Sequence, residues 1–339
     1  MHDPPLRVRF DQWVDYCLYD PGIGFYRAGH GRSGRRGDFL TSPEVGPLFG
    51  AVLARALDHW WDELGQPGRF PVVDAGSGPG TLLKALEVAA PRCAAAWTLR
   101  AADVAPGMTP DLGDVAGGVV LANELLDNLP FRVLVPVSAA GPALDRRLRF
   151  DEVFVDRVDI DASAVEVLVP TTWVPVRWVP VQRVPPLLAD RSVDGRFPVV
   201  ETASAWVAAA LDRGPARLVA FDYGTQTTVE LSARGGWLRT YRRHERGADP
   251  YRQPGRWDIT TDVPFDQLPS PTRLETQAAF LDRFGIHELV EEGRAIWRQK
   301  AARPDLHAMR MRSRVSEADA LLDPDGLGGW LVATWEVDQ

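Results

Sequence analysis

The segment Val72–Thr81, Val-Val-Asp-Ala-Gly-Ser-Gly-Pro-Gly-Thr, constrains the fold of this chain more than any other. An apolar run reaches an acid, and three glycines then follow at every second position, at Gly76, Gly78 and Gly80. This order is typical of a strand that turns sharply into a helix around a nucleotide. The dinucleotide fingerprint G-x-G-x-x-G needs its third glycine one residue later, where this chain has Thr81. The spacing therefore disfavours a dinucleotide-dependent oxidoreductase, and a plain tight turn is the alternative that the motif alone leaves open.

Strands and helices alternate along most of the chain after Phe70. We expect a helix over 81–90 and strands over 70–74, 97–103, 118–122, 217–221 and 330–337. Such alternation predicts an α/β fold with a mostly parallel sheet, covered by helices on both faces. Ligands of these sheets bind at the carboxyl ends of the strands. Four polar residues fall at such ends: Asp74, Asp103, Asn123 and Asp222.

Changes in pattern predict where the domains begin and end. We expect an N-terminal helical extension with an active-site loop over residues 1–68, and a Rossmann-like domain over 69–130 and 199–339. The segment 131–198 is rich in short strand patterns and predicts an inserted β-rich lobe. Its proline-containing repeat at 173–182 predicts an edge strand or extended arm. A second, irregular insertion is expected at 231–268.

Composition narrows the class of protein. The 339 residues carry a net charge of -8, which argues against a general nucleic-acid-binding protein. Neither the two cysteines nor the histidines have metal-ligand spacing, so we expect no metal site and no disulfide framework. No run of about eighteen apolar residues occurs, and the N-terminus lacks the apolar core of a signal peptide. A cytoplasmic protein that does not span a membrane is therefore expected.

Five sequence blocks, in this order, resemble one family. They are Leu18–Pro21 with Gly24–Tyr26, Gly37–Glu44, Asn123–Pro130, Asp222–Gly224, and Leu238–Tyr241 with His244. Together with the glycine turn they are similar to the MidA-like class I methyltransferases, which depend on S-adenosyl-L-methionine (SAM). That family includes a mitochondrial complex I assembly factor that methylates a protein arginine. The resemblance implies a Rossmann-like sheet whose last strand is antiparallel, a protein substrate, and a homodimer as one possible assembly.

The resemblance also implies roles for individual residues. Residues expected to hold the cofactor are Asp74, Gly76, Gly78, Gly80, Asp103, Asn123, Thr41, Ser42 and Pro43. Glu124, Asp127 and Glu44 are the expected catalytic acids, because carboxylates beside an acceptor guanidinium can orient it and accept its proton. At i and i+3, Glu124 and Asp127 would share one face of a starting helix. The alternative is that they only stabilise that helix N-terminus.

One stretch departs from the family pattern. Only Val104–Gly117 separates Asp103 from the next core strand, and its glycines and prolines leave no room for both a helix and a strand. We therefore expect the edge strand to be shortened or lost and the adenine-side wall to be built differently, which leaves the affinity for the cofactor open. Two alternative functions stay open: a non-catalytic assembly or scaffold protein, and a methyltransferase of small molecules.

Overall fold

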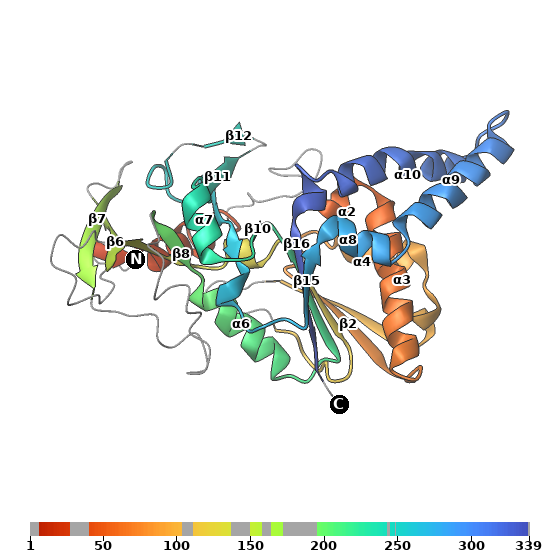
Figure 1. Cartoon of the computed structure of the whole chain (residues 1–339), viewed down its shortest axis with the longest axis horizontal. Helices are drawn as coiled ribbons and strands as arrows, with labels where there is room; N and C mark the ends of the chain where they lie inside the picture. The colour runs from red at the N-terminus through yellow and green to blue at the C-terminus, as the bar shows by residue number, and fades with distance from the viewer. Residues whose placement is uncertain are drawn as a thin grey trace. The chain divides into compact units, whose positions relative to one another are not determined.

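The computed structural model describes residues 7–27, 41–103, 111–136, 150–157, 164–171, 195–242, 245–247 and 249–337 (Figure 1). The chain divides into two compact units. The first unit comprises Met1–Gly31, Leu126–Ala208 and Gly224–Ser270, and the second comprises Arg32–Leu125, Ala209–Tyr223 and Pro271–Gln339. In the described part of the chain, no helix has the length and apolar character needed to cross a bilayer.

The second unit contains a six-stranded sheet in the order β15-β16-β9-β4-β2-β3. Neighbouring strands from β3 to β9 are parallel, whereas β16 is antiparallel to both β9 and β15. The strands are β2 (Phe70–Ala75), β3 (Trp97–Ala102), β4 (Val119–Asn123), β9 (Arg217–Asp222), β15 (Arg273–Thr276) and β16 (Leu331–Glu336). This arrangement confirms the expected α/β class.

Six α-helices of the second unit are described. They are α2 (Ser42–Val45), α3 (Pro47–Glu63), α4 (Thr81–Ala89), α8 (Gln277–Arg283), α9 (Ile286–Lys300) and α10 (Leu306–Leu322), with 3-10 turns at Arg92–Ala95 and Leu327–Gly329. The apolar core lies between the sheet and these helices. The ring of Phe221 on β9 packs edge-on against the rings of Phe49 on α3 and Phe280 on α8. The distances between ring centroids are 5.4 Å to Phe49 and 5.0 Å to Phe280. These aromatic contacts hold α3 and α8 against the sheet.

Strand β3 is the last strand of this sheet. Its residues Thr98, Arg100 and Ala101 are exposed, as expected of a strand with a neighbour on one side only. The segment 104–110 lies outside the described residues, and the described remainder of Val104–Gly117 contains no strand. In the described residues β3 is the edge strand, and the expected shortening or loss of a strand in Val104–Gly117 stays a prediction.

The first unit contains an antiparallel sheet in the order β1-β6-β5-β8, with β7 also paired to β6. Its strands are β1 (Arg7–Arg9), β5 (Arg132–Pro136), β6 (Phe150–Arg157), β7 (Ala164–Thr171) and β8 (Phe197–Val199). Strands β5, β6 and β7 lie within the segment 131–198, where the strands of an inserted lobe are expected. Because β1 hydrogen-bonds to β6, the N-terminal residues belong with the inserted strands and not with α3. The two units thus differ from the expected division at residue 68.

The remaining elements of the first unit include a three-stranded sheet in which β11 pairs with β12 and β13. They are α1 (Phe10–Tyr19), α6 (Glu201–Leu211, which continues into the second unit), α7 (Thr228–Arg234), β10 (Gly224–Thr225), β11 (Leu238–Arg242), β12 (Glu245–Arg246), β13 (Asp258–Thr261), β14 (Val263–Pro264), and 3-10 turns at Leu126–Asn128 and Phe265–Gln267. The second insertion is therefore largely regular, which the sequence did not predict. The proline-containing repeat at 173–182 lies outside the described residues.

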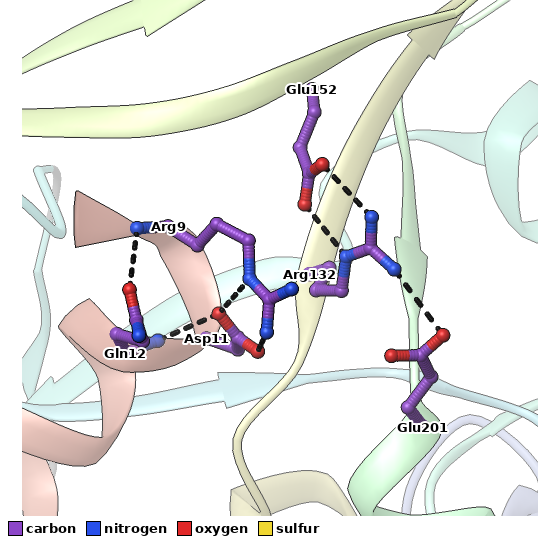
Figure 2. A network of polar contacts seen from close by, with 6 residues as sticks. All are labelled: Arg9, Asp11, Gln12, Arg132, Glu152 and Glu201. Atoms are coloured by element: carbon purple, nitrogen blue, oxygen red, sulfur yellow. Dashed lines mark hydrogen bonds and ion pairs between the residues drawn. The ribbon is translucent and has the colours of Figure 1, made fainter. Parts of the chain in front are cut away.

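A buried ion-pair network crosses the antiparallel sheet of the first unit (Figure 2). Arg132 on β5 binds both carboxylate oxygens of Glu152 on β6, at 2.6 and 2.8 Å, and its third contact is Glu201 at 3.2 Å. Arg132 and Glu152 are each only 5% exposed. Arg9 forms a similar two-pronged contact with Asp11 at the start of α1. The network joins β5 and β6 to the first turn of α6 through the buried Arg132 and Glu152 and the half-buried Glu201.

Candidate functional site

The glycine turn follows β2 in the second unit as expected. Gly76, Gly78 and Gly80 all have left-handed backbone conformations, with φ of 75°, 47° and 71°. Side chains disfavour this region, so the turn requires glycine at these positions. A Cβ added at Gly78 or Gly80 would meet no atom of the protein within 4 Å, so both glycines border open space. The turn leaves its backbone accessible to a ligand.

Asp74 lies at the end of β2, one residue before the turn begins. Its side chain is 3% exposed, and its Oδ2 is buried without a hydrogen-bond partner among the described residues. Burial, together with the charge of Asp103, raises the pKa of Asp74 to about 7. A buried carboxylate oxygen without a donor is costly for a folded protein unless a proton or a cationic ligand compensates it. Asp74 is therefore suited to meet a cationic group.

The neighbouring strand ends supply further polar atoms. Asp74 pairs in register with Ala101 of β3 and Leu121 of β4, so Asp103 and Asn123 follow at the same edge of the sheet. Asp103 is exposed, and Asn123 has a buried Oδ1 without a hydrogen-bond partner in the described structure. The Asn123 amide nitrogen donates to Oε1 of Glu124 at 3.0 Å. The second unit thus brings together all the strand-end residues predicted to hold a cofactor.

Glu124 has an unusual backbone conformation. Its φ is 53°, in the left-handed region, and its N–H donates to the carbonyl of Phe221 on β9 at 2.9 Å. Left-handed backbone costs a residue other than glycine about 1–2 kcal/mol, and such strain concentrates at functional sites. The expected helix does not start here, because only the 3-10 turn Leu126–Asn128 follows. Glu124 and Asp127 therefore do not share a helix face, and they belong to different units.

The block Thr41–Glu44 begins the described part of the second unit. Glu44 accepts a hydrogen bond from the backbone N–H of Thr41 at 3.3 Å, in a capping box at the start of α2. Ser42 is fully buried and donates its hydroxyl to Gln277 at 2.9 Å, and Pro43 is buried beside it. The Glu44 side chain thus caps α2, and the Ser42 side chain joins α2 to α8. The preceding residues Gly37–Leu40 lie outside the described residues.

A buried polar cluster in the first unit was missed by the sequence reasoning. The Tyr26 hydroxyl lies 3.1 Å from Oδ1 of Asp258 and 3.0 Å from Oδ1 of Asn128, and the Asn128 amide donates to the same Asp258 oxygen at 3.1 Å. Burial and the charge of Asp127 raise the pKa of Asp258 to about 8. Asp127 is 3% exposed and Asp258 2%. No sequence pattern marked Asp258, which lies in β13, a strand whose four residues are all buried in the structure.

Comparison with known proteins decides the family. Residues 93–284, more than half of the chain, match the model of a family described as "Putative S-adenosyl-L-methionine-dependent methyltransferase". The chain belongs to this methyltransferase family. Its cofactor is S-adenosyl-L-methionine, and the expected MidA-like relationship is confirmed.

Two solved structures share the fold of this methyltransferase, and curated relatives match a short segment of it. A COG1565 superfamily member from Burkholderia thailandensis, crystallised with S-adenosyl-homocysteine, has a TM-score of 0.72 at 23% identity, covering 98% of this chain and 88% of that one. A native structure from the same superfamily and organism has a TM-score of 0.69 at 22% sequence identity. That comparison covers 98% of this chain and 87% of the other. This chain is also similar to the mitochondrial protein arginine methyltransferase NDUFAF7. It is 36% identical over 73 residues to the Drosophila melanogaster homolog and 33% identical over 72 residues to the Homo sapiens protein. These matches span 22% and 21% of this chain but only 16% of either relative.

The raised pKa of Asp74 predicts how stability of the cofactor-free methyltransferase depends on pH. Between the unfolded pKa near 4 and the folded pKa of about 7, the folded protein holds a proton that the unfolded chain has lost. The contribution of Asp74 to the unfolding free energy is therefore fully present below pH 4. It falls as the pH rises to 7, by at most about 4 kcal/mol. We expect Asp74→Asn to flatten the fall in unfolding free energy between pH 5 and pH 8, measured by urea denaturation. Exposed Asp319→Asn is the control, and an unchanged pH profile in Asp74→Asn would contradict the assignment.

Proposed function

We propose that this methyltransferase modifies a protein side chain, with arginine as the favoured acceptor. The observation that carries the proposal is Glu124, a carboxylate held in a left-handed backbone directly after β4, next to the strand ends of the second unit. A guanidinium is planar and carries five N–H donors, so acceptor sites for arginine need carboxylates that bind it in a fixed orientation. The NDUFAF7 relatives, which are named protein arginine methyltransferases, support the same acceptor.

For the cofactor, we propose that Asp74, Asp103, Asn123 and the glycine turn hold SAM in the second unit. The methionine part of SAM carries an ammonium group, which suits the unpartnered Oδ2 of Asp74. Asp103 is exposed beside the turn and suited to accept hydrogen bonds from ribose hydroxyls. Bound SAM supplies a methyl group on a sulfonium centre, and the protein supplies orientation and electrostatics. Thr41, Ser42 and Pro43 stay predicted cofactor contacts, and Glu44 stays a predicted catalytic acid.

For the chemistry, we propose that Glu124 acts on the acceptor, and Asp127, in the other unit, stays a catalytic residue predicted from the sequence. A carboxylate beside a guanidinium can localise its charge, fix one nitrogen toward the reacting methyl group and accept the proton that methylation releases. Glu124 has the strained backbone, and in the first unit the charge of Asp127 raises the pKa of the neighbouring Asp258. In this proposal Asp258, Tyr26 and Asn128 hold the Asp127 region in place through their mutual hydrogen bonds.

The experiment that tests the acceptor class uses tritiated methyl-SAM with the purified protein and a bacterial protein extract. We expect label in protein, and acid hydrolysis of the labelled band should release methylated arginine. Label confined to small molecules would overturn the protein-substrate proposal. Methylated lysine in the hydrolysate would overturn the assignment of arginine as acceptor and keep the protein substrate.

The exposed edge at β3 favours one second candidate, a scaffold protein with a weakened cofactor site. Saturable binding of S-adenosyl-homocysteine with no transfer to any acceptor would support that candidate.

The strained Glu124 predicts opposite effects on stability and activity. We expect Glu124→Gly to raise the unfolding free energy by about 1 kcal/mol, because glycine adopts the left-handed conformation without steric cost. The same change should lower the rate of methyl transfer at least ~100-fold, as should Glu124→Gln, because both remove the carboxylate. Affinity for S-adenosyl-homocysteine should stay within about threefold of wild type.

Exposed Glu87→Gln serves as the matched control, since it neutralises a carboxylate of the same unit outside the turn. Transfer at the wild-type rate by Glu124→Gln would remove Glu124 from the proposed site.

A cytoplasmic location and a homodimer stay predictions of the sequence.

A further inference from the structure

The helical hairpin formed by α9 and α10 has a composition unlike the rest of the chain. Residues 294–314 contain six arginines and Lys300 against a single acid, Asp305, a local net charge of +6 in a chain of net charge -8. We call this segment the hairpin tip. Lys300, Arg303, Arg310 and Arg312 are all exposed. A concentrated positive field on an acidic protein selects for partners of negative charge.

The hairpin tip also exposes large apolar side chains. Leu306 is 76% exposed and Met309 is 57% exposed. They are two of the four large apolar side chains that are exposed in the described part of the chain. Leu306, Met309 and Arg310 stand at positions i, i+3 and i+4 of α10, so they share one helix face. Apolar side chains flanked by arginines are typical of protein-binding surfaces.

Several cations of the hairpin tip are already paired, and others are not. Lys300 pairs with Asp305, Arg294 with Glu291, and Arg314 donates to the Leu289 carbonyl. Arg312 lies over the ring of Trp297 at 4.8 Å. Within the described residues, the side chains of Arg303 and Arg310 make no ion pair. These two arginines flank Leu306 and Met309 and are available to a partner.

The two helices hold this surface in a fixed shape (Figure 1). At Gly293 of α9, an added Cβ would lie 2.5 Å from the backbone oxygen of Met311, so α10 passes directly against α9. Asp305 caps α10 by accepting from the N–H of Ala308 at 2.7 Å. A pre-formed surface binds without the entropic cost of ordering a loop.

We propose that the hairpin tip, with Leu306 and Met309 at its centre and Arg303 and Arg310 at its edges, docks an acidic segment of a partner protein. Arginine binds carboxylates in two-pronged fashion, and the two apolar side chains fit apolar residues between the acids of such a segment. Two exposed apolar residues bury too little area for insertion into a membrane. Single-stranded nucleic acid is disfavoured because Arg312 covers one face of Trp297, the aromatic ring of the hairpin tip. The proposal does not depend on the methyl acceptor.

The test uses a fluorescein-labelled peptide of five Glu-Glu-Leu repeats, with anisotropy measured at 100 mM salt. We expect saturable binding to the whole chain, weakened at least tenfold by Arg303→Glu with Arg310→Glu, and at least threefold by Leu306→Ser with Met309→Ser. The charge-matched control, Arg213→Glu with Arg273→Glu, changes two exposed arginines elsewhere in the same unit and should leave the affinity within twofold. Affinity for S-adenosyl-homocysteine should be unchanged in all variants, which keeps this test separate from that of the proposed function.

Three outcomes would overturn the proposal. One is the absence of saturable peptide binding, and another is an equal loss in the charge-matched control. The third is tighter binding, dependent on the same arginines, to a 20-nucleotide single-stranded RNA or to phosphatidylglycerol vesicles, which would assign the surface to nucleic acid or lipid.

Discussion

Replacing Gly78 with valine is expected to abolish measurable binding of S-adenosyl-homocysteine, a loss of at least ~100-fold in affinity or about 3 kcal/mol. Two physical reasons combine at this position. The φ of 47° is disfavoured for a β-branched side chain, so the turn must shift to relieve about 1–2 kcal/mol of strain. The new side chain would also occupy the open space next to the turn, in which no protein atom lies within 4 Å of the added Cβ. Isothermal titration calorimetry measures the affinity directly.

Gly65 offers a matched control for this experiment. It has a φ of 76°, and an added Cβ would meet no atom within 4 Å, so valine imposes a similar strain there. Gly65 precedes β2, whereas Gly78 follows it, so the two glycines lie beyond opposite ends of the same strand. We expect both variants to lose about 1–2 kcal/mol of stability, and only Gly78→Val to lose ligand affinity. Equal affinities in the two variants would show that the cofactor is not held at the glycine turn.

The second large effect is expected at the buried network of the first unit. Arg132→Met should lower the unfolding free energy by about 3–5 kcal/mol, because Glu152 would keep its charge in a site that is 5% exposed, with its cation removed. Urea denaturation followed by circular dichroism measures the change. If the two units unfold in separate transitions, the shift should be confined to the transition of the first unit.

Two further variants separate the cost of an unpaired charge from the value of the pair. Arg132→Met combined with Glu152→Met removes both charges and should recover most of the lost stability, since buried ion pairs often contribute little net energy over apolar residues. Arg252→Met removes a 74% exposed arginine that pairs with Asp249, and should change stability by less than about 1 kcal/mol. A double variant as unstable as Arg132→Met alone would contradict the explanation by charge burial.

The local features of the second unit were predictable from sequence because each depends on a few neighbouring residues. The apolar run of β2 and the three glycines that follow are a local pattern, and strand and turn formed where that pattern predicts. The strand ends at Asp103 and Asn123 were placed correctly for the same reason. The pairing of β1 with β6 was not predicted, because strand pairing over more than a hundred residues leaves no local signal.

The acids show the same contrast at the level of single residues. Glu124 was singled out from its motif, yet its left-handed backbone depends on the N–H contact to Phe221, almost a hundred residues away. Asp258 drew no attention as a lone acid in the sequence, because only folding brings it to Tyr26 and Asn128.

By itself, the sequence determined the α/β class, the glycine turn and the family, because these depend on periodicity and on residue types at fixed spacing. Tertiary structure alone decided which distant groups meet: the division into two units, the Tyr26–Asp258 contact and the partners of Arg132. The physical reason is that burial and charge depend on the full set of neighbours. The pKa of Asp74 rises to about 7 because the folded chain buries its carboxylate and places Asp103 beside it.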